Sequence, residues 1–210
     1  MASTYIYAED YTDFEAQLEE TWDLEGEYRL VDVEYIDDQW AGVFVDNGLA
    51  NAINTDETFS GLQKQISNSF EEDYDLVDID YVDDTWIAVF DKDSSIQSSD
   101  YELALDVTEL VEDAETQFDN GSQLIDVEYA NGNWVGVFGK SAEQSAINTA
   151  DSLTGFKSVV TQRRAEEFDL VGVEYAEDSW VGVFTKDPFH TTKYAIANDT
   201  DEFLTKFEQR

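Results

Sequence analysis

Carboxylates are the residues of this chain that are numerous and close enough to do chemistry. Two acidic clusters stand out, namely Asp32, Glu34, Asp37 and Asp38 in one, and Asp78, Asp80, Asp83 and Asp84 in the other. Calcium prefers several carboxylate oxygens from one flexible loop, so a low-affinity cation site is one interpretation. No Asp-x-Asp-x-Asp-Gly loop with a distal Glu is present. We therefore predict solvated acidic faces and no defined metal site.

Four tryptophans recur at almost constant spacing, each followed by an alternation of small residues and Val that ends in Phe. They are Trp40, Trp86, Trp134 and Trp180, which lie 46, 48 and 46 residues apart. If these rings were exposed, they would form a repeated platform on which sugars could stack. Because buried aromatic rings dominate protein cores, we interpret the rings as core and keep the ligand platform as the alternative.

Catalytic groups are scarce. The sole histidine, His190, lies in an irregular segment beside the only proline, and the chain has no cysteine. A catalytic Ser–His pair or a histidine metal site would need partners to which the sequence does not point, and no Gly-rich phosphate loop is present. With 49 acids, some carboxylate pair will lie at glycosidase spacing by chance, so such a pair carries no information. We predict no catalytic residue, no cofactor and no enzymatic activity.

These residues belong to a fourfold repeat, whose copies span residues 30–44, 76–90, 124–138 and 170–184. In the first copy, positions 31, 33 and 35 are apolar while 32 and 34 are acidic, which predicts a strand with two different faces. An acidic or Asn-Gly turn follows, and Asn131-Gly132 is the strongest hairpin signal because both residues tolerate positive φ. The second strand is apolar on both faces, as in a strand that is covered on both sides.

A segment of helical period precedes each hairpin. In the first copy, Phe14, Leu18 and Trp22 recur at four-residue spacing, which predicts an amphipathic helix. The groups expected to cap the four helices are Thr12-Asp13, Thr55-Asp56, Ser99-Asp100 and Asp151-Ser152. A short extended piece precedes each helix, so the predicted unit is β-α-β-β and about 47 residues long.

The whole chain, residues 1–210, is therefore predicted to be one α+β repeat domain. The predicted repeats span 4–46, 50–92, 94–140 and 144–187, and a C-terminal half-repeat spans 193–210. A unit of this size cannot bury its own apolar face, so neighbouring units must pack together. We expect about four and a half units stacked as a short solenoid or as a closed propeller-like ring, and the sequence does not separate these two arrangements.

The repeat resembles a known family. The string 118–124, followed by Trp134 and a Val-Phe ending, is similar to a tandem repeat of cyanobacterial and other bacterial proteins, with the approximate pattern Trp-Asp-x-Gly-Tyr-x-Ile and then Trp-x-x-Val-Met/Phe. A similar repeat lies in the C-terminal region of plant casein-kinase-1-like proteins. The Gly of the pattern is replaced by Asp73 and Glu167, and its Tyr by Ser122. The resemblance lies in framework positions, implies no catalytic residue, and favours a binding or accessory role.

The net charge excludes several classes of protein. With 11 basic and 49 acidic residues the formal charge is 11 − 49 = −38, so direct binding to nucleic acid and a basic membrane-surface patch are excluded. No stretch approaches the roughly 18 apolar residues of a membrane span, and the first residues lack the features of a signal peptide. Because 42% of the residues are hydrophobic, we expect a folded, soluble and cytoplasmic protein.

The charge is also unevenly distributed. Residues 1–140 hold 36 acids and 4 bases, a net of −32, whereas residues 141–210 hold 13 acids and 7 bases, a net of −6. Adaptation to high salt should affect all exposed surface alike, but a dedicated binding surface need not. Our hypothesis is a non-enzymatic acidic interaction protein that binds a basic partner, such as a nucleic-acid-binding protein that it occupies as a DNA mimic.

The predicted partner-binding residues are acids of the first three hairpins. They are Asp32, Glu34, Asp37, Asp38, Asp78, Asp80, Asp83, Asp84, Asp126 and Glu128. One alternative is a salt-adapted, halophilic structural or carbohydrate-binding repeat protein that uses the four tryptophans. Another alternative is a low-affinity cation-binding repeat protein. The identity of the partner and the oligomeric state stay open.

Overall fold

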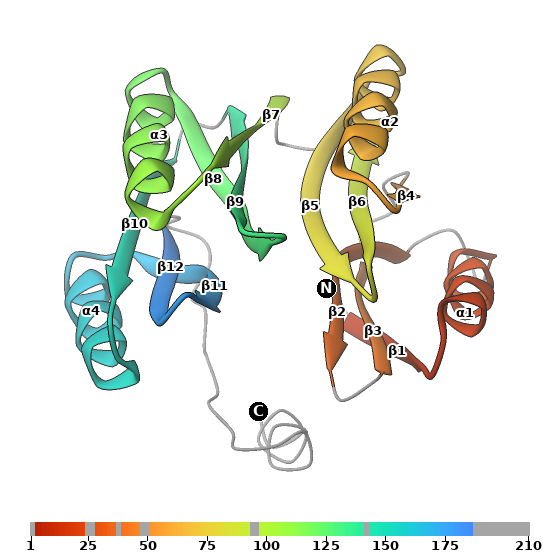
Figure 1. Cartoon of the computed structure of the whole chain (residues 1–210), viewed down its shortest axis with the longest axis horizontal. Coiled ribbons are helices and arrows are strands. Elements are labelled where there is room, and N and C mark those ends of the chain that lie inside the picture. The colour runs from red at the N-terminus through yellow and green to blue at the C-terminus, as the bar shows by residue number, and fades with distance from the viewer. Residues whose placement is uncertain are drawn as a thin grey trace.

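A computed structural model describes residues 3–23, 28–36, 39–46, 51–92, 97–140 and 143–186. Within these ranges the order strand, helix, strand, strand occurs four times. We call these stretches unit 1 (3–46), unit 2 (51–92), unit 3 (97–140) and unit 4 (144–186). In Figure 1 the four helices lie at the periphery and the strands lie between them. The half-repeat predicted at 193–210 lies outside the described residues.

The helices and strands have the following bounds. Unit 1 contains β1 (Ser3–Ala8), α1 (Tyr11–Asp23), β2 (Tyr28–Ile36) and β3 (Gln39–Asp46). Unit 2 contains β4 (Asn51–Asp56), α2 (Phe59–Glu71), β5 (Tyr74–Val82) and β6 (Thr85–Lys92). Unit 3 contains β7 (Gln97–Ala104), α3 (Val107–Asp119), β8 (Ser122–Ala130) and β9 (Asn133–Lys140). Unit 4 contains β10 (Gln144–Ala150), α4 (Leu153–Ala165), β11 (Asp169–Ala176) and β12 (Ser179–Lys186).

Each unit forms its own three-stranded antiparallel sheet, with its last strand in the middle. The orders are β1-β3-β2, β4-β6-β5, β7-β9-β8 and β10-β12-β11. The predicted α+β class with a stacked solenoid or a closed ring is therefore wrong: the described residues are mostly β, arranged as discrete sheets. The physical reason is that the strand pairs of these sheets join strands of the same unit, whereas the sequence period predicts the repetition but not the hydrogen bonding between copies.

The hairpin turns that the structure describes are tight. In units 2, 3 and 4 they contain two residues with positive φ, namely Asp83-Asp84, Asn131-Gly132 and Glu177-Asp178. Two positive φ values in a two-residue loop define a type I′ turn, which matches the twist of the flanking strands and favours Asn-Gly. Acidic residues therefore occupy strained turn positions in units 2 and 4.

A β-bulge recurs at one position of the first hairpin strand. The register shifts between Leu30 and Asp32 in unit 1, and at the corresponding position in the other three units. In unit 1, Leu30 pairs with Phe44 and Val33 pairs with Gly42, so both lie on the sheet face that carries Trp40. Because of the bulge, this leucine lies on the same face as Val33, whereas simple alternation would place residues 30 and 33 on opposite faces.

The helix of each unit covers this Trp–Phe face, which we call the helix face of the sheet. Its small central residue permits a close approach, because a Cβ added to Gly42 would lie 3.1 Å from the Phe14 ring of α1. A Cβ at Gly182 would lie 2.7 Å from the Phe156 ring of α4. A small residue at this position, glycine in units 1, 3 and 4 and Ala88 in unit 2, is thus a packing requirement between helix and sheet.

The opposite face, which we call the back face, packs on the preceding unit. The cluster around Phe14 and Trp40 of unit 1 includes Ile87 and Val89 of β6. In the same way, the cluster of unit 2 includes back-face residues of unit 3, and the cluster of unit 3 includes back-face residues of unit 4. The second hairpin strand is therefore apolar on both faces because one face contacts its own helix and the other contacts the preceding unit.

Candidate interaction surface

The acids at alternate positions of the first hairpin strands lie on the back face. Asp78 pairs with Val89 and Asp80 pairs with Ile87, and both carboxylates are buried. They lie at the junction with unit 1, whose core cluster includes their cross-strand partners. The expectation that Asp78 and Asp80 present charge to a partner is therefore corrected. Alternation predicted the face correctly, but only the packing of units shows that this face is covered.

The corresponding acids of unit 3 lie at the junction between units 2 and 3. The backbone N–H of Ile79 donates a hydrogen bond to Oδ2 of Asp126 at 3.3 Å. β5 is an edge strand of its sheet, so its outward backbone groups need partners from outside the sheet. Asp126 and Glu128 are half-buried, and Asp126 thus joins two units as well as carrying charge.

The junction between units 3 and 4 contains an acid with an altered pKa. The pKa of Glu174 is raised to about 7, mainly by burial; a hydrogen bond from the Tyr175 backbone opposes this shift, and the charge of Asp126 adds to it. A carboxylic acid with this pKa is partly protonated at neutral pH. Glu174, the acid at the last of the three junctions, therefore has a charge that depends on pH.

An ion pair connects units 1 and 2. Arg29 of β2 pairs with the fully buried Asp91 of β6. The side chain of Asn51 donates to Oδ1 of Asp91 at 3.0 Å and to the carbonyl of Leu30 at 3.2 Å. Burial raises the pKa of Asp91, and the positive charge of Arg29 opposes that shift. One of the eleven basic residues is thus committed to holding two units together.

Among the predicted partner-binding acids whose side chains the structure describes, the exposed ones lie at a hairpin turn. Asp83 and Asp84 are both exposed, and the hydroxyl of Tyr81 donates to Oδ1 of Asp84 at 3.3 Å. Asp37 and Asp38 lie outside the described residues. The backbone of Asp32 pairs with that of Val43, and the backbone of Glu34 pairs with that of Ala41.

Two helices carry a larger exposed acidic surface that the sequence analysis missed. α1 contains five acids and no base, and α3 contains five acids and no base. The exposed acids of α3 are Glu109, Glu112, Glu115 and Asp119, while its buried side carries Leu110 and Ala114. α4 contains three bases and no acid. Counting charge per helix, rather than per hairpin, would have found this contrast.

The tryptophan rings are mostly closed to solvent. Trp40, Trp86 and Trp134 are buried, and Trp180 is half-buried. The ring of Trp86 packs edge-on against Phe59, with centroids 4.7 Å apart. A repeated sugar platform is therefore corrected to a repeated core position, because the helix of each unit covers the rings.

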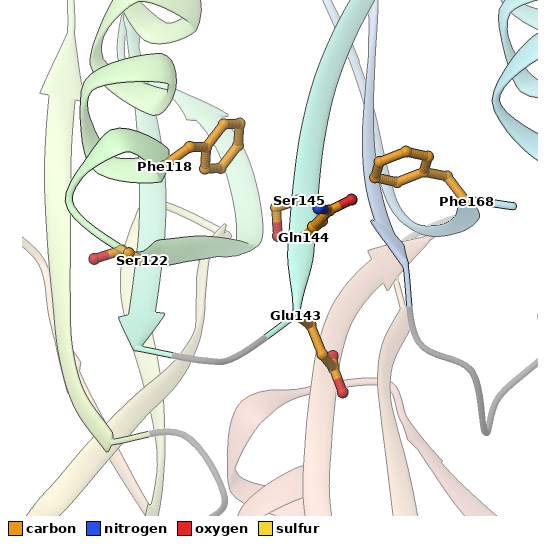
Figure 2. Close-up of a pocket in the computed structure, with 7 residues that line it drawn as sticks. Phe118, Ser122, Glu143, Gln144, Ser145 and Phe168 are labelled. Carbon is orange, nitrogen blue, oxygen red and sulfur yellow. The ribbon is translucent and has the colours of Figure 1, made fainter. Parts of the chain in front are cut away.

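A pocket of about 280 Å³ lies between units 3 and 4. Figure 2 shows Phe118 and Phe168 on either side of Gln144 and Ser145. The remaining lining residues are Gly121, Ser122 and Glu143. This set combines two rings with one carboxylate, one amide and two hydroxyls, and it defines no ligand class.

Three further features of the chain concern metal binding, membrane spans and the single histidine. Within the described ranges, no group of three or more His, Asp or Glu side chains is arranged to hold a metal ion. None of the described helices is long and apolar enough to cross a membrane. His190 lies outside the described residues.

Comparison with known proteins gives no match: no protein-family model matches the chain, and neither does any curated protein or solved structure. The resemblance to the bacterial and plant tandem repeat therefore stays a proposal.

Proposed function

We propose that this chain is a non-enzymatic acidic interaction protein that binds a basic partner mainly through the exposed faces of α1 and α3. One observation carries the proposal: helices at equivalent places in the repeated fold differ in charge. α1 and α3 each contain five acids, whereas α4 contains three bases. A general need for hydration would not select particular helices. A surface that binds a partner would instead place its acids on particular helices.

The spacing of these acids supports a linear array of charge. A helix rises about 1.5 Å per residue, so the four exposed acids between positions 109 and 119 of α3 span about 15 Å. That is roughly one charge per 4–5 Å, within about a factor of three of the one charge per ~1.7 Å of duplex DNA. A nucleic-acid-binding protein is therefore the partner class that we propose, and such charge also speeds association.

Glu109 shows that part of this array is fixed in place. The N-cap Asp106 accepts hydrogen bonds from the backbone N–H groups of Thr108 and Glu109. The carboxylate of Glu109 in turn accepts from the backbone N–H of Leu105 at 2.7 Å. This arrangement is similar to a capping box, except that the glutamate accepts from the N–H of the residue before the N-cap, and it orders the first turn of α3 without burying its charge.

Binding to poly-L-lysine and to core histones, measured by titration at several salt concentrations, tests the proposal. The variant Glu112→Gln/Glu115→Gln/Asp119→Asn removes three charges from α3, and we expect about tenfold weaker binding and a smaller salt slope. The matched control Glu166→Gln/Glu167→Gln/Asp178→Asn removes three exposed charges from unit 4, and we expect less than a twofold change. Equal losses in both variants would show a diffuse charge effect and reject the directed surface.

Two further measurements separate the alternatives. Release of a histone from duplex DNA by the chain would support the DNA-mimic form of the proposal, and failure to compete would limit it to other basic partners. Unfolding of the chain below about 1 M KCl would instead show that the charge is an adaptation to salt, because at that ionic strength the Debye length is only about 3 Å.

A further inference from the structure

Units 1 and 4 are the two ends of the series of described units. Each of them exposes one of the two sheet faces that meet where neighbouring units pack together. One residue position represents each face. On the helix face it is a position in the first hairpin strand, which holds Val33, Ile79, Val127 and Val173 in units 1 to 4. On the back face it is a position in the middle strand, which holds Val43, Val89, Val137 and Val183. We call these the receiving position and the inserting position.

Inside the chain the two positions meet three times. Val33 and Val89 share the core cluster between units 1 and 2. Ile79 and Val137 share the next cluster, and Val127 and Val183 share the third. The junction is therefore heterologous, because a different face of each unit takes part, and it repeats in one direction along the chain.

At the ends the pattern is broken. The receiving position is 0%, 1% and 4% exposed in units 1 to 3, but Val173 of unit 4 is 50% exposed. The inserting position is 1%, 0% and 0% exposed in units 2 to 4, but Val43 of unit 1 is 36% exposed. Each end thus has the apolar surface of a junction, and none of the described units covers it.

Aromatic residues enlarge both exposed surfaces. Tyr175 and Val171 of β11 are exposed beside Val173, and Tyr5 and Tyr7 of β1 are exposed beside Val43. Tyr5 pairs with Val43 as Ile147 pairs with Val183, and Ile147 is buried in the junction of units 3 and 4. Adjoining exposed apolar residues of this kind mark interaction sites.

The charge distribution favours a particular incoming unit. In the junction of units 3 and 4, α3 lies against β10. The helix in the equivalent place at the open end is α4, which carries Lys157, Arg163 and Arg164 and no acid. β1 of unit 1 is followed by the exposed acids Glu9 and Asp10. A unit 1 that docked on unit 4 would bring these acids toward the most basic helix that the structure describes.

We propose that a second copy of this chain binds at the open end, with the back face of its unit 1 on the helix face of unit 4. Among the described sheets, that of unit 1 has the matching back face uncovered, which is why the occupant is another copy. Because the interface is heterologous, each bound copy leaves one open end, and assembly continues beyond the dimer. Repulsion between chains of charge −38 weakens this association at low salt.

Sedimentation equilibrium of the full chain at about 1 M KCl, where the Debye length is about 3 Å, tests the proposal without any basic partner. We expect the average mass of the wild type to rise with concentration past that of a dimer. Val173→Asp and Val43→Asp should each sediment as a monomer. A 1:1 mixture of these two variants should form a dimer and nothing larger, since each contributes its one intact face.

The control is Leu105→Asp, because Leu105 is the most exposed of the large apolar residues that the structure describes but lies at neither end. We expect it to associate as the wild type does, and circular dichroism should show all three variants folded. A wild type that stays monomeric, or a variant mixture that stays monomeric, would overturn the proposal. Association only after removal of residues 187–210 would also overturn it, by showing that this segment occupies the face. These results are independent of binding to basic proteins, which high salt suppresses.

Discussion

Units 3 and 4 have the same order of helix and strands, yet they differ in the charge of the helix, in the sequence of the hairpin turn and in the residue that follows the helix. Both contain a 13-residue helix and a hairpin with a two-residue turn. Unit 3 has an acidic helix, an Asn-Gly turn and a glycine after its helix, whereas unit 4 has a basic helix, a Glu-Asp turn and a glutamate there. The fold constrains packing positions, and the residues that face outward are available for binding.

The largest expected difference concerns the receiving position. Val127→Asp should destabilise the chain by about 4 kcal/mol or more, because an unpaired charge would replace a buried side chain in the junction of units 3 and 4. Val173→Asp should change the unfolding free energy by less than about 1 kcal/mol, since Val173 is half exposed. Urea unfolding of both variants measures this, and equal losses would show that Val173 is covered as completely as Val127.

A second expected difference concerns the junction acid Glu174. Its pKa is raised to about 7 in the folded chain, so the folded state holds a proton that the unfolded state has lost between about pH 4.5 and 7. The stability that this group contributes is therefore present at low pH and is lost as the pH rises through about 7. Glu174→Gln should stabilise the chain by about 1–3 kcal/mol at pH 8 and by much less at pH 5.

Thermal or urea unfolding across this pH range provides the measurement for Glu174. Glu128→Gln in unit 3 is the matched control, because Glu128 occupies the equivalent position, paired with Val135 as Glu174 is paired with Val181. If Glu174→Gln left the pH profile unchanged, desolvation at this junction would be smaller than the packing indicates.

A third expected difference lies after the helices. Glu167 has φ 67° and Gly121 has φ 81° at corresponding positions, and only glycine adopts this region at no cost. Glu167→Gly should therefore stabilise unit 4 by about 1 kcal/mol, and Gly121→Glu should destabilise unit 3 by a similar amount. Chemical denaturation of the two variants tests the pair, and the same sign for both would refute the strain argument.

The smallest expected difference lies in the hairpin turns. Replacing Glu177-Asp178 with Asn-Gly should add about 0.5–1 kcal/mol, because both residues have positive φ and Asn-Gly suits a type I′ turn. The reciprocal change, Asn131→Glu with Gly132→Asp, should cost a similar amount. Melting temperatures of the two double variants provide the check, and no shift in either would mean that the turns carry no strain.

Prediction from sequence succeeded for the repeated aromatic positions, because large aromatic rings are mostly buried in protein cores. The repeated Trp, small residue and Phe predicted core positions, and Trp40 and Trp134 are buried. Local signals were less decisive: Ser99-Asp100 was expected to cap the third helix, but both residues lie in β7 and the cap is Asp106. Several short polar groups compete for such a position, and local sequence does not rank them.

The charged surface was predicted least well. Acids at Asp78 and Asp80 alternate with apolar residues exactly as solvent-facing residues do, yet they are buried. An alternating strand has two faces, and nothing local states what covers either of them. The acids of α3 were missed because they show no fourfold repetition.

The sequence by itself determined the period, the element order and the identity of the core rings, because these follow from local spacing and from apolar burial. Tertiary structure decided which strands pair, which sheet face each neighbouring unit covers, and therefore which acids remain exposed. The physical reason is that pairing and coverage depend on contacts between residues far apart in the chain. Glu174 and Val173 illustrate this, since one has a raised pKa because unit 3 is beside it and the other is exposed because no fifth sheet among the described residues covers it.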